Sequence, residues 1–202
     1  MNTLPGYLRQ AGTALRFLLL ATVVLGLIYP LAIFGVGQAV APFQANGSIV
    51  EDAGGKPAAS ALIAQVSAND AGTQDPRWFH ARPSAAKWDP GASTASNLGP
   101  DDPKLLDAVK ANRAAVAAAE GVTESEVPAD AVTASGSGLD PQISAAYARL
   151  QVPRVAKAHG LSPETVQAMV DRRTSTGLEA FLAQPSVNVT ELNLDLAAAA
   201  AK

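Results

Sequence analysis

The chain has 202 residues, no cysteine and two histidines, which excludes disulfides, thiolate metal sites and cysteine nucleophiles. Its 15 basic and 18 acidic side chains give a net charge of −3, and the first 40 residues hold two arginines and no acid, so the remainder carries 13 − 18 = −5. This acidic balance offers no basic stripe, and we expect no nucleic acid partner.

An uncharged apolar run lies near the N-terminus. The stretch 17–36 is apolar on every face, which indicates a membrane span rather than an amphipathic surface helix. A helix of about 20 residues rises about 30 Å, which is enough to cross a bilayer. Arg9 and Arg16 precede the run, and the first charges after it are acids at 51 and 52.

This charge asymmetry predicts the orientation, because positively charged flanks stay in the cytoplasm. We therefore expect a cytoplasmic segment over 1–16, a single transmembrane helix over 17–40 and an exported domain over 41–202. A cleaved signal peptide is the alternative, since residues 39–41 (Ala-Val-Ala) fit a signal peptidase site. The apolar run is longer than a signal peptide needs and has Pro30 in its interior, which favours the uncleaved anchor.

Small residues in the span indicate contact with another helix. Thr22 and Gly26 lie four residues apart, so they share one face and permit close approach. Pro30 removes one helix hydrogen bond, and we predict a kink there. We take Thr22, Gly26, Tyr29 and Pro30 as helix-packing candidates, with a lipid-facing anchor as the alternative. The span has no ionisable residue, so it is an anchor or a docking helix.

The remaining residues, about 160, suffice for one domain. Short strands are expected over 48–50 and 60–65, joined by a turn at Gly54 and Gly55. The stretch 67–103 is rich in Ser, Gly, Pro and Asn but holds two tryptophans, which predicts a long ordered loop.

Capping residues predict three helices in the exported part. Asp102 followed by proline begins the first, which Gly121 ends. Asp140 followed by proline begins a second that runs to His159 and bends or splits at Pro153. Ser162 begins a third that ends near residue 173.

The C-terminal part predicts a short helical turn over 177–182, then a late strand over 187–196 with a bulge at 190–191. Residues 197–202 read as a frayed tail. The fold class is therefore α+β, with one transmembrane helix followed by a mixed α/β domain.

Three motifs are candidates for function. The turn Ser135-Gly-Ser-Gly138 lacks the spacing of a nucleophile elbow and of a phosphate loop, which favours a tight structural turn. A membrane-anchored periplasmic serine hydrolase with Ser135 or Ser137 as nucleophile is the alternative, and it would need one of the two histidines. His159 reads as a helix cap rather than a ligand.

The other two motifs lie in the long loop. Arg82 follows an aromatic pair and is expected to stack on Trp78 or Phe79, or to pair with Asp89, with contact to a partner as the alternative. Ser96 and Asn97 read as a turn.

In their order along the chain, several segments resemble the C subunit of the Kdp potassium-transporting P-type ATPase. They are 26–31 (GLIYPL), 44–48 (QANGS), 82–85 (RPSA), 96–100 (SNLGP), 132–141 (VTASGSGLDP), 151–156 (QVPRVA), 187–189 (VNV) and 192–194 (LNL). The resemblance covers nearly the whole chain, and the segment 132–141 is the most specific.

The resemblance implies a non-catalytic accessory subunit of a high-affinity, ATP-driven potassium uptake complex in the bacterial inner membrane. Its implied partners are a channel-like potassium-binding subunit, the P-type ATPase subunit and a small single-helix subunit, within a lipid bilayer. The family is also described as a catalytic chaperone that raises the affinity of the ATPase subunit for ATP.

The predicted topology separates the exported domain from cytoplasmic ATP. We therefore expect no cofactor or metal bound directly by this chain, and potassium as the ion that the complex transports. Structural or partner-contact roles are expected for Arg82, Ser96, Asn97, Ser135, Ser137, Asp140, Gln151 and Arg154.

Overall fold

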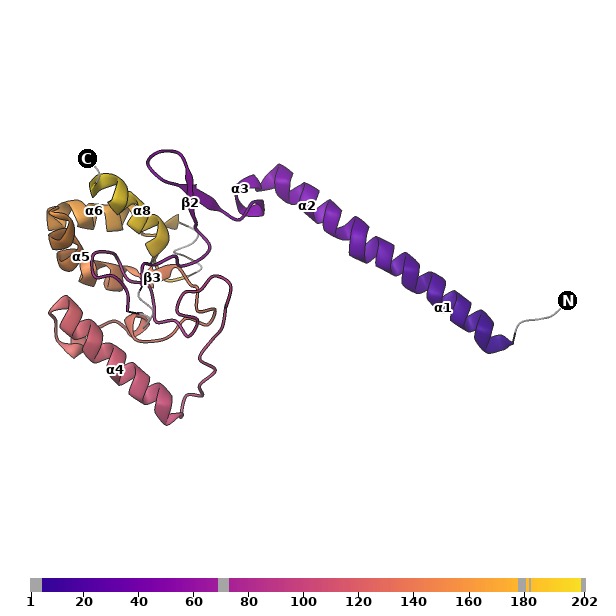
Figure 1. The fold of residues 1–202 in the computed structure, drawn as a ribbon, viewed down its shortest axis with the longest axis horizontal. Helices are drawn as coiled ribbons and strands as arrows, with labels where there is room; N and C mark the ends of the chain where they lie inside the picture. Colours follow the sequence, from indigo (N-terminus) through magenta and orange to yellow (C-terminus); the bar gives the residue numbers. More distant parts are fainter. Residues whose placement is uncertain (1–4, 69–72, 178–180, 182, 201–202) are drawn as a thin grey trace. The chain divides into compact units, whose positions relative to one another are not determined.

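The computed structural model describes residues 5–68, 73–177, 181 and 183–200. The chain forms two compact units, residues 1–48 and residues 49–202 (Figure 1). The first is mainly one long helix and the second is a mixed α/β domain.

The first unit consists of α1 (Gly6–Val23), a π-helical turn (Val24–Ile28), α2 (Tyr29–Val40) and the single turn α3 (Pro42–Ala45). Together α1, the π-turn and α2 form a continuous helix of 35 residues with none of its side chains buried, long and apolar enough to cross a membrane. A π-turn lies just before Pro30, a common way to accommodate a disrupted hydrogen-bond ladder, and the kink predicted at Pro30 stays a prediction.

A pair of side-chain amides closes the C-terminal end of this unit. Gln38 and Asn46 exchange two hydrogen bonds of 3.2 and 3.1 Å, and Asn46 Nδ2 also donates to the Pro42 carbonyl at 2.7 Å. These contacts fold α3 back toward the end of α2.

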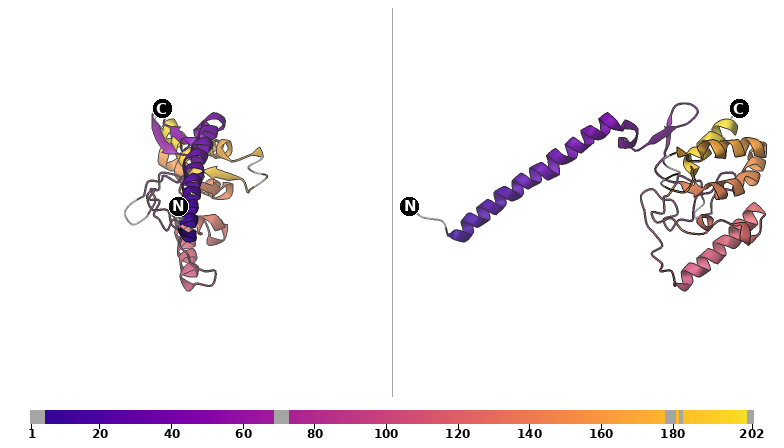
Figure 2. Two further views of the ribbon diagram at one scale, coloured as in Figure 1. Left: turned by 90° about the vertical axis from the view of Figure 1, so that its right-hand side faces the viewer. Right: turned by 180° about the vertical axis from the view of Figure 1, so that it is seen from behind.

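The second unit contains two antiparallel two-stranded sheets and four longer helices among its described residues. Its elements are β1 (Ile49–Glu51), β2 (Pro57–Ser60), α4 (Pro103–Glu120), two 3₁₀ turns (Glu124–Glu126 and Ala129–Ala131), β3 (Gln142–Ser144), α5 (Ala145–His159), α6 (Pro163–Arg173), β4 (Ser186–Asn188) and α8 (Val189–Ala200). The core lies between α5, α6, α8 and the β3–β4 pair, and its largest fully buried apolar side chains are Phe79, Ile143, Val155, Val166, Val170, Val187, Val189, Leu192 and Leu196. Helix α4 lies along one side of the elements that enclose this core (Figures 1 and 2).

Two predicted helices and one turn are confirmed. Asp102 caps α4 by accepting from Lys104 N, and Gly121 ends the helix with φ 70°. Ser162 caps α6 in the same way. The turn at Gly54 and Gly55 joins β1 to β2.

The second strand of the hairpin is misplaced in the prediction, because β2 ends where the predicted strand 60–65 begins. Gln65 Oε1 accepts from Ser60 N at 2.6 Å and so folds this segment into a turn. Ala64 N then donates to the Leu139 carbonyl at 2.7 Å, far along the chain.

The predicted start of the second helix is wrong. Asp140 does not cap a helix; its Oδ1 accepts from Gln142 N in a local turn, and β3 follows. Ser144 caps α5 instead, through Tyr147 N. The helix is not split at Pro153, whose side chain is exposed, so water can satisfy the carbonyl that lacks a partner.

The late strand is mostly a helix, and the tail is not frayed through residue 200. Only Ser186–Asn188 is a strand, and α8 then runs to Ala200. Val189, Leu192 and Leu196 are all fully buried at helical spacing, and Asn188 Oδ1 accepts from Glu191 N at the start of the helix. The predicted turn over 177–182 falls largely outside the described residues.

Candidate functional site

The Ser-Gly turn is fastened to the long loop by backbone and hydroxyl groups. Ser135 N donates to the Pro83 carbonyl at 2.9 Å, and Ser84 Oγ donates to the Gly138 carbonyl at 2.6 Å. Ser137 O accepts both from Thr94 N at 3.0 Å and from the Ser93 hydroxyl at 2.9 Å. We call this set of contacts, between 83–94 and 135–138, the loop–turn junction.

Gly138 is the tightest point of the loop–turn junction. Its φ is 70°, a left-handed value that disfavours any residue with a Cβ. A Cβ placed there would lie 2.7 Å from the Thr94 carbonyl oxygen and 2.8 Å from Ala86 Cβ. Glycine is therefore required both by the backbone angle and by the close approach of the loop.

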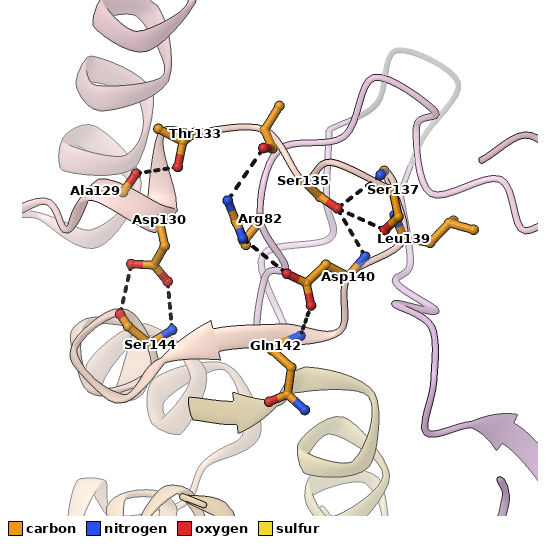
Figure 3. A network of polar contacts seen from close by, with 12 residues as sticks. Arg82, Ala129, Asp130, Thr133, Ser135, Ser137, Leu139, Asp140, Gln142 and Ser144 are labelled. Atoms are coloured by element: carbon orange, nitrogen blue, oxygen red, sulfur yellow. Dashed lines mark hydrogen bonds and ion pairs between the residues drawn. The ribbon is translucent and has the colours of Figure 1, made fainter. Parts of the chain in front are cut away.

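Hydroxyl groups complete the turn itself. Ser135 Oγ lies 3.1 Å from Ser137 Oγ and accepts from Gly138 N and Asp140 N. Ser137 Oγ accepts from Leu139 N at 3.0 Å (Figure 3). Both hydroxyls thus satisfy the backbone of a tight turn.

Two aspartates border an open cleft of about 550 Å³ beside the junction. Asp140 Oδ1 accepts from Gln142 N at 2.9 Å, and Asp130 accepts from the amide and hydroxyl of Ser144 at 2.7 and 2.8 Å (Figure 3). These amides belong to β3, on the side that does not face β4. The two carboxylates therefore cap the outer edge of β3 and oppose pairing with a further strand.

Arg82 joins the loop to this cleft. Its Nη1 lies 3.1 Å from Asp140 Oδ2, and its Nη2 donates to the Ala134 carbonyl at 3.5 Å. Arg82 Nε is buried and has no hydrogen-bond partner among the residues that the structure describes. The predicted stacking on Trp78 or Phe79 and the predicted pair with Asp89 are thus replaced by an ion pair with Asp140.

Three side-chain amides hold the extended segment 79–81. Each bonds the N–H and the C=O of one residue: Asn193 for Phe79 at 2.9 and 3.0 Å, Gln151 for His80 at 2.7 and 3.2 Å, and Gln74 for Ala81 at 2.8 and 3.0 Å. A carboxamide offers one acceptor and two donors, so it can replace the neighbouring strand that this segment lacks.

A buried ion pair anchors the same segment. Arg154 Nε lies 3.0 Å from Glu120 Oε1, and the two side chains are 12% and 1% exposed. Arg154 also donates to Gln151 Oε1 at 2.9 Å and to the carbonyls of Trp78, at 3.0 Å, and Pro76. Burial raises the pKa of Glu120, and the Arg154 guanidinium offsets part of that rise.

Comparison with known proteins identifies the family. The family described as "K+-transporting ATPase, c chain" matches residues 11–198. The chain belongs to the KdpC family. Three similar relatives, each named "Potassium-transporting ATPase KdpC subunit", come from Kineococcus radiotolerans (51% identity over 98% of this chain and 97% of the relative), Caulobacter vibrioides (51%, over 86% and 85%) and Ralstonia nicotianae (44%, over 93% and 92%).

The predicted site residues fall into separate groups. Arg82, Ser135, Ser137 and Asp140 come together around the loop–turn junction, whereas Gln151 and Arg154 bond each other and the segment that ends at residue 81. Ser96 and Asn97 are exposed in the loop, and Asn97 has a left-handed φ of 54°. The helix-packing candidates Thr22, Gly26, Tyr29 and Pro30 belong to the first unit, where all four are exposed.

The contacts of the serines and histidines do not form a hydrolase site within the described residues. Ser135 and Ser137 bond the backbone and each other, and neither bonds a histidine. His80 Nε2 lies 3.1 Å from the Asp75 carbonyl, and His159 Nε2 lies 2.9 Å from the Arg77 carbonyl. His159 is the last residue of α5, as predicted, and Gly160 follows it with φ 65°.

Several residues in these networks have no local sequence signal. Gln74 and Glu120 belong to no motif, and the bonded partners of Gln74, Glu120 and Asn193 lie from 7 to 114 positions away. Asn193 lies inside the matched segment 192–194 (LNL), which was the only signal that could have pointed to it.

We predict that stability falls on acidification because of His80. Burial and the nearby Arg154 charge lower the pKa of His80 to about 4. In the unfolded chain the pKa of the His80 imidazole is near 6.5, so the unfolded state binds this proton more readily than the folded state. The free energy of unfolding therefore keeps this contribution above pH 6.5 and loses it as the pH falls toward 4. We expect a loss of about 2 kcal/mol between pH 7 and pH 5, measured by urea unfolding of the purified chain.

The variant His80→Gln, which cannot take up a proton, serves as the control for this prediction. Its unfolding free energy should change less between the two pH values. An equal change in the variant and the wild type would assign the pH dependence to other groups.

Proposed function

We propose that this chain is a non-catalytic accessory subunit of an ATP-driven potassium uptake complex in the bacterial inner membrane. The observation that carries the proposal is the family match over residues 11–198, joined by relatives named as potassium-transporting ATPase subunits along nearly their whole length. The partners are a channel-like potassium-binding subunit, the P-type ATPase subunit and a small single-helix subunit.

In this proposal the two units have different tasks. The long helix spans the bilayer with its N-terminus in the cytoplasm and packs beside helices of the partners. The domain lies in the periplasm and covers the extracellular mouth of the channel-like subunit. Its charge of −5 concentrates cations weakly, within about 8 Å of the surface at physiological salt.

The helix also offers a route by which this chain raises the ATP affinity of its partner. ATP is cytoplasmic and most polar residues of this chain are assigned to the other side, so coupling runs through helix packing rather than direct contact. Thr22 and Gly26 provide the face for close approach, because they share one side of the helix and both are exposed.

The test is to replace Gly26 by leucine in the reconstituted complex. Among the described residues a Cβ at Gly26 meets only Thr22 Cγ2, at an ordinary 3.8 Å, so the helix itself tolerates the change. We expect either loss of co-purification with the partners or an apparent ATP affinity weakened about fivefold or more in an intact complex. The readouts are pull-down and potassium-stimulated ATP hydrolysis.

Gly35→Leu is the matched control, because a Cβ there has no described neighbour within 4 Å. A complex assembled without this chain is the second comparison, and it should lose potassium-stimulated hydrolysis. Full activity without the chain would overturn the accessory role, whereas wild-type behaviour of Gly26→Leu would overturn only coupling through this helix face.

A further inference from the structure

A second cavity in the domain shares no described lining residue with the cleft beside β3. It has a volume of about 380 Å³ and is bounded by the long loop, by α4 and by Tyr147 of α5. The residues that matter for its chemistry are His80, Ser84, Trp88, Asn112, Val116 and Tyr147. A cavity of this size, with an aromatic wall and a few polar groups, is typical of small-molecule sites.

Tyr147 lines this cavity with an unused hydroxyl. The side chain is buried, with the residue only 2% exposed, yet no described residue bonds its hydroxyl; the contact of Tyr147 with Ser144 Oγ is made by its backbone N–H. Buried phenol groups usually find a hydrogen-bond partner. The free hydroxyl therefore offers one donor and one acceptor to a molecule in the cavity.

Two further polar groups on the cavity wall have unused acceptors. Asn112 Nδ2 donates to the Val132 carbonyl at 3.2 Å, which leaves its Oδ1 without a partner in the described chain. His80 Nε2 contacts a carbonyl and therefore carries the proton, so Nδ1 keeps a lone pair. Together with Tyr147 these groups suit a ligand that has several hydroxyl donors.

The described lining residues carry no formal charge, since none of them is Asp, Glu, Lys or Arg. The pKa of His80, lowered to about 4 by burial and by Arg154, keeps the ring neutral at physiological pH. A charged ligand would lose hydration here without a compensating ion pair, so the lining selects for uncharged molecules.

The aromatic wall is held in a strained conformation. Lys87 and Trp88 have left-handed φ values of 51° and 57°, which are unusual for side chains of this size. Trp88 is fixed at both ends, since its N–H donates to Ser84 Oγ at 3.0 Å and its indole Nε1 donates to the Arg82 carbonyl at 3.1 Å. Such strain persists where the surroundings impose it, and here it holds Trp88 in the lining of the same cavity as the apolar Val116.

We propose that this cavity binds one uncharged, polyhydroxylated small molecule such as a monosaccharide or cyclic polyol. At about 30 Å³ per water-sized group, 380 Å³ accommodates about a dozen non-hydrogen atoms, which is the size of a single sugar ring. The hydroxyls bond Tyr147, Asn112 and His80, and the C–H face of the ring packs on Trp88.

The binding test uses the full chain in phospholipid nanodiscs, because detergents with sugar headgroups would compete. The chain has two tryptophans, and Trp78 packs against His159 with ring centroids 5.0 Å apart, so the variant Trp78→Phe leaves Trp88 as the single fluorescent reporter. The probes are D-glucose and myo-inositol, and gluconate is the charged counterpart of glucose. We expect a saturable change in Trp88 fluorescence with at least one neutral probe and none with gluconate.

Two variants on the reporter background test the site itself. Tyr147→Phe should weaken binding about tenfold, the effect of one lost hydrogen bond, without lowering the unfolding midpoint because no described residue bonds that hydroxyl. Ala115→Phe enters the cavity from an exposed position of α4 and should abolish binding, whereas Ala118→Phe, exposed on the same helix and outside the cavity lining, should not.

The proposal is overturned by any of three results. These are the absence of a saturable response to both neutral probes, an equal response to gluconate, and binding that is unchanged in both Tyr147→Phe and Ala115→Phe.

Discussion

Replacing Gly138 by alanine is expected to destabilise the domain by about 3 kcal/mol or more. A left-handed backbone costs a residue with a Cβ about 1–2 kcal/mol, and overpacking against fixed neighbours adds about 1–3 kcal/mol. Here the neighbours are the Thr94 carbonyl at 2.7 Å and Ala86 Cβ at 2.8 Å, and neither belongs to a flexible side chain. The loss is a large fraction of the stability of a typical domain.

Gly136→Ala is the matched control, because a Cβ at Gly136 has no neighbour within 4 Å and its φ is not left-handed. Both variants are measured by urea unfolding of the chain and by potassium-stimulated ATP hydrolysis of the assembled complex. We expect Gly138→Ala to lower both quantities and Gly136→Ala to change neither appreciably. Equal unfolding free energies for the two variants would show that the loop–turn junction is not tightly packed.

Elements with strong local signals could be predicted from the sequence. Helix α4 has an Asp-Pro start and a glycine stop, and α6 has a Ser-Pro start, and both fold as these signals indicate. Capping works at this range because each cap satisfies backbone groups within three residues of itself.

Elements that depend on distant partners could not be predicted in the same way. The stretch 187–196 alternates apolar and polar residues, which predicts a strand, but the spacing of Val189, Leu192 and Leu196 also fits a helix. The helix forms because it buries these three side chains in the core. Likewise Asp140 followed by proline is a helix start in isolation, yet β3 begins there because it pairs with β4 some 45 residues later.

The candidate site shows the same division. The tight turn at Gly138 follows from its local composition, whereas the partner of Arg82 does not, because Asp140 lies 58 positions away. The amides that hold 79–81 come from the long loop, α5 and α8, and an amide side chain gives no sign in sequence of the backbone that it will bond. Long-range polar contacts are therefore the part of this fold that only the structure reveals.

Replacing Arg154 by methionine is expected to cost about 3–5 kcal/mol, the typical penalty when one member of a buried ion pair is removed. The Glu120 carboxylate, 1% exposed, would keep its charge without a partner, and the Trp78 carbonyl would lose its donor. Unfolding by urea, monitored by circular dichroism, measures the loss. Arg149→Met is the control: that arginine is 56% exposed and lies 3.7 Å from Asp171, so its removal should cost about 0.5 kcal/mol or less.

The pH dependence of the Arg154→Met variant separates this electrostatic cause from lost packing. Burial already raises the pKa of Glu120, and without the guanidinium the pKa rises further in the folded state. The folded variant then binds a proton more readily than the unfolded chain, so acidification stabilises it relative to the wild type. The double variant Glu120→Gln with Arg154→Met should recover part of the loss at neutral pH. A loss that is the same at pH 5 and pH 7, and is not reduced in the double variant, would mean that methionine fails by shape and not by leaving a charge unpaired.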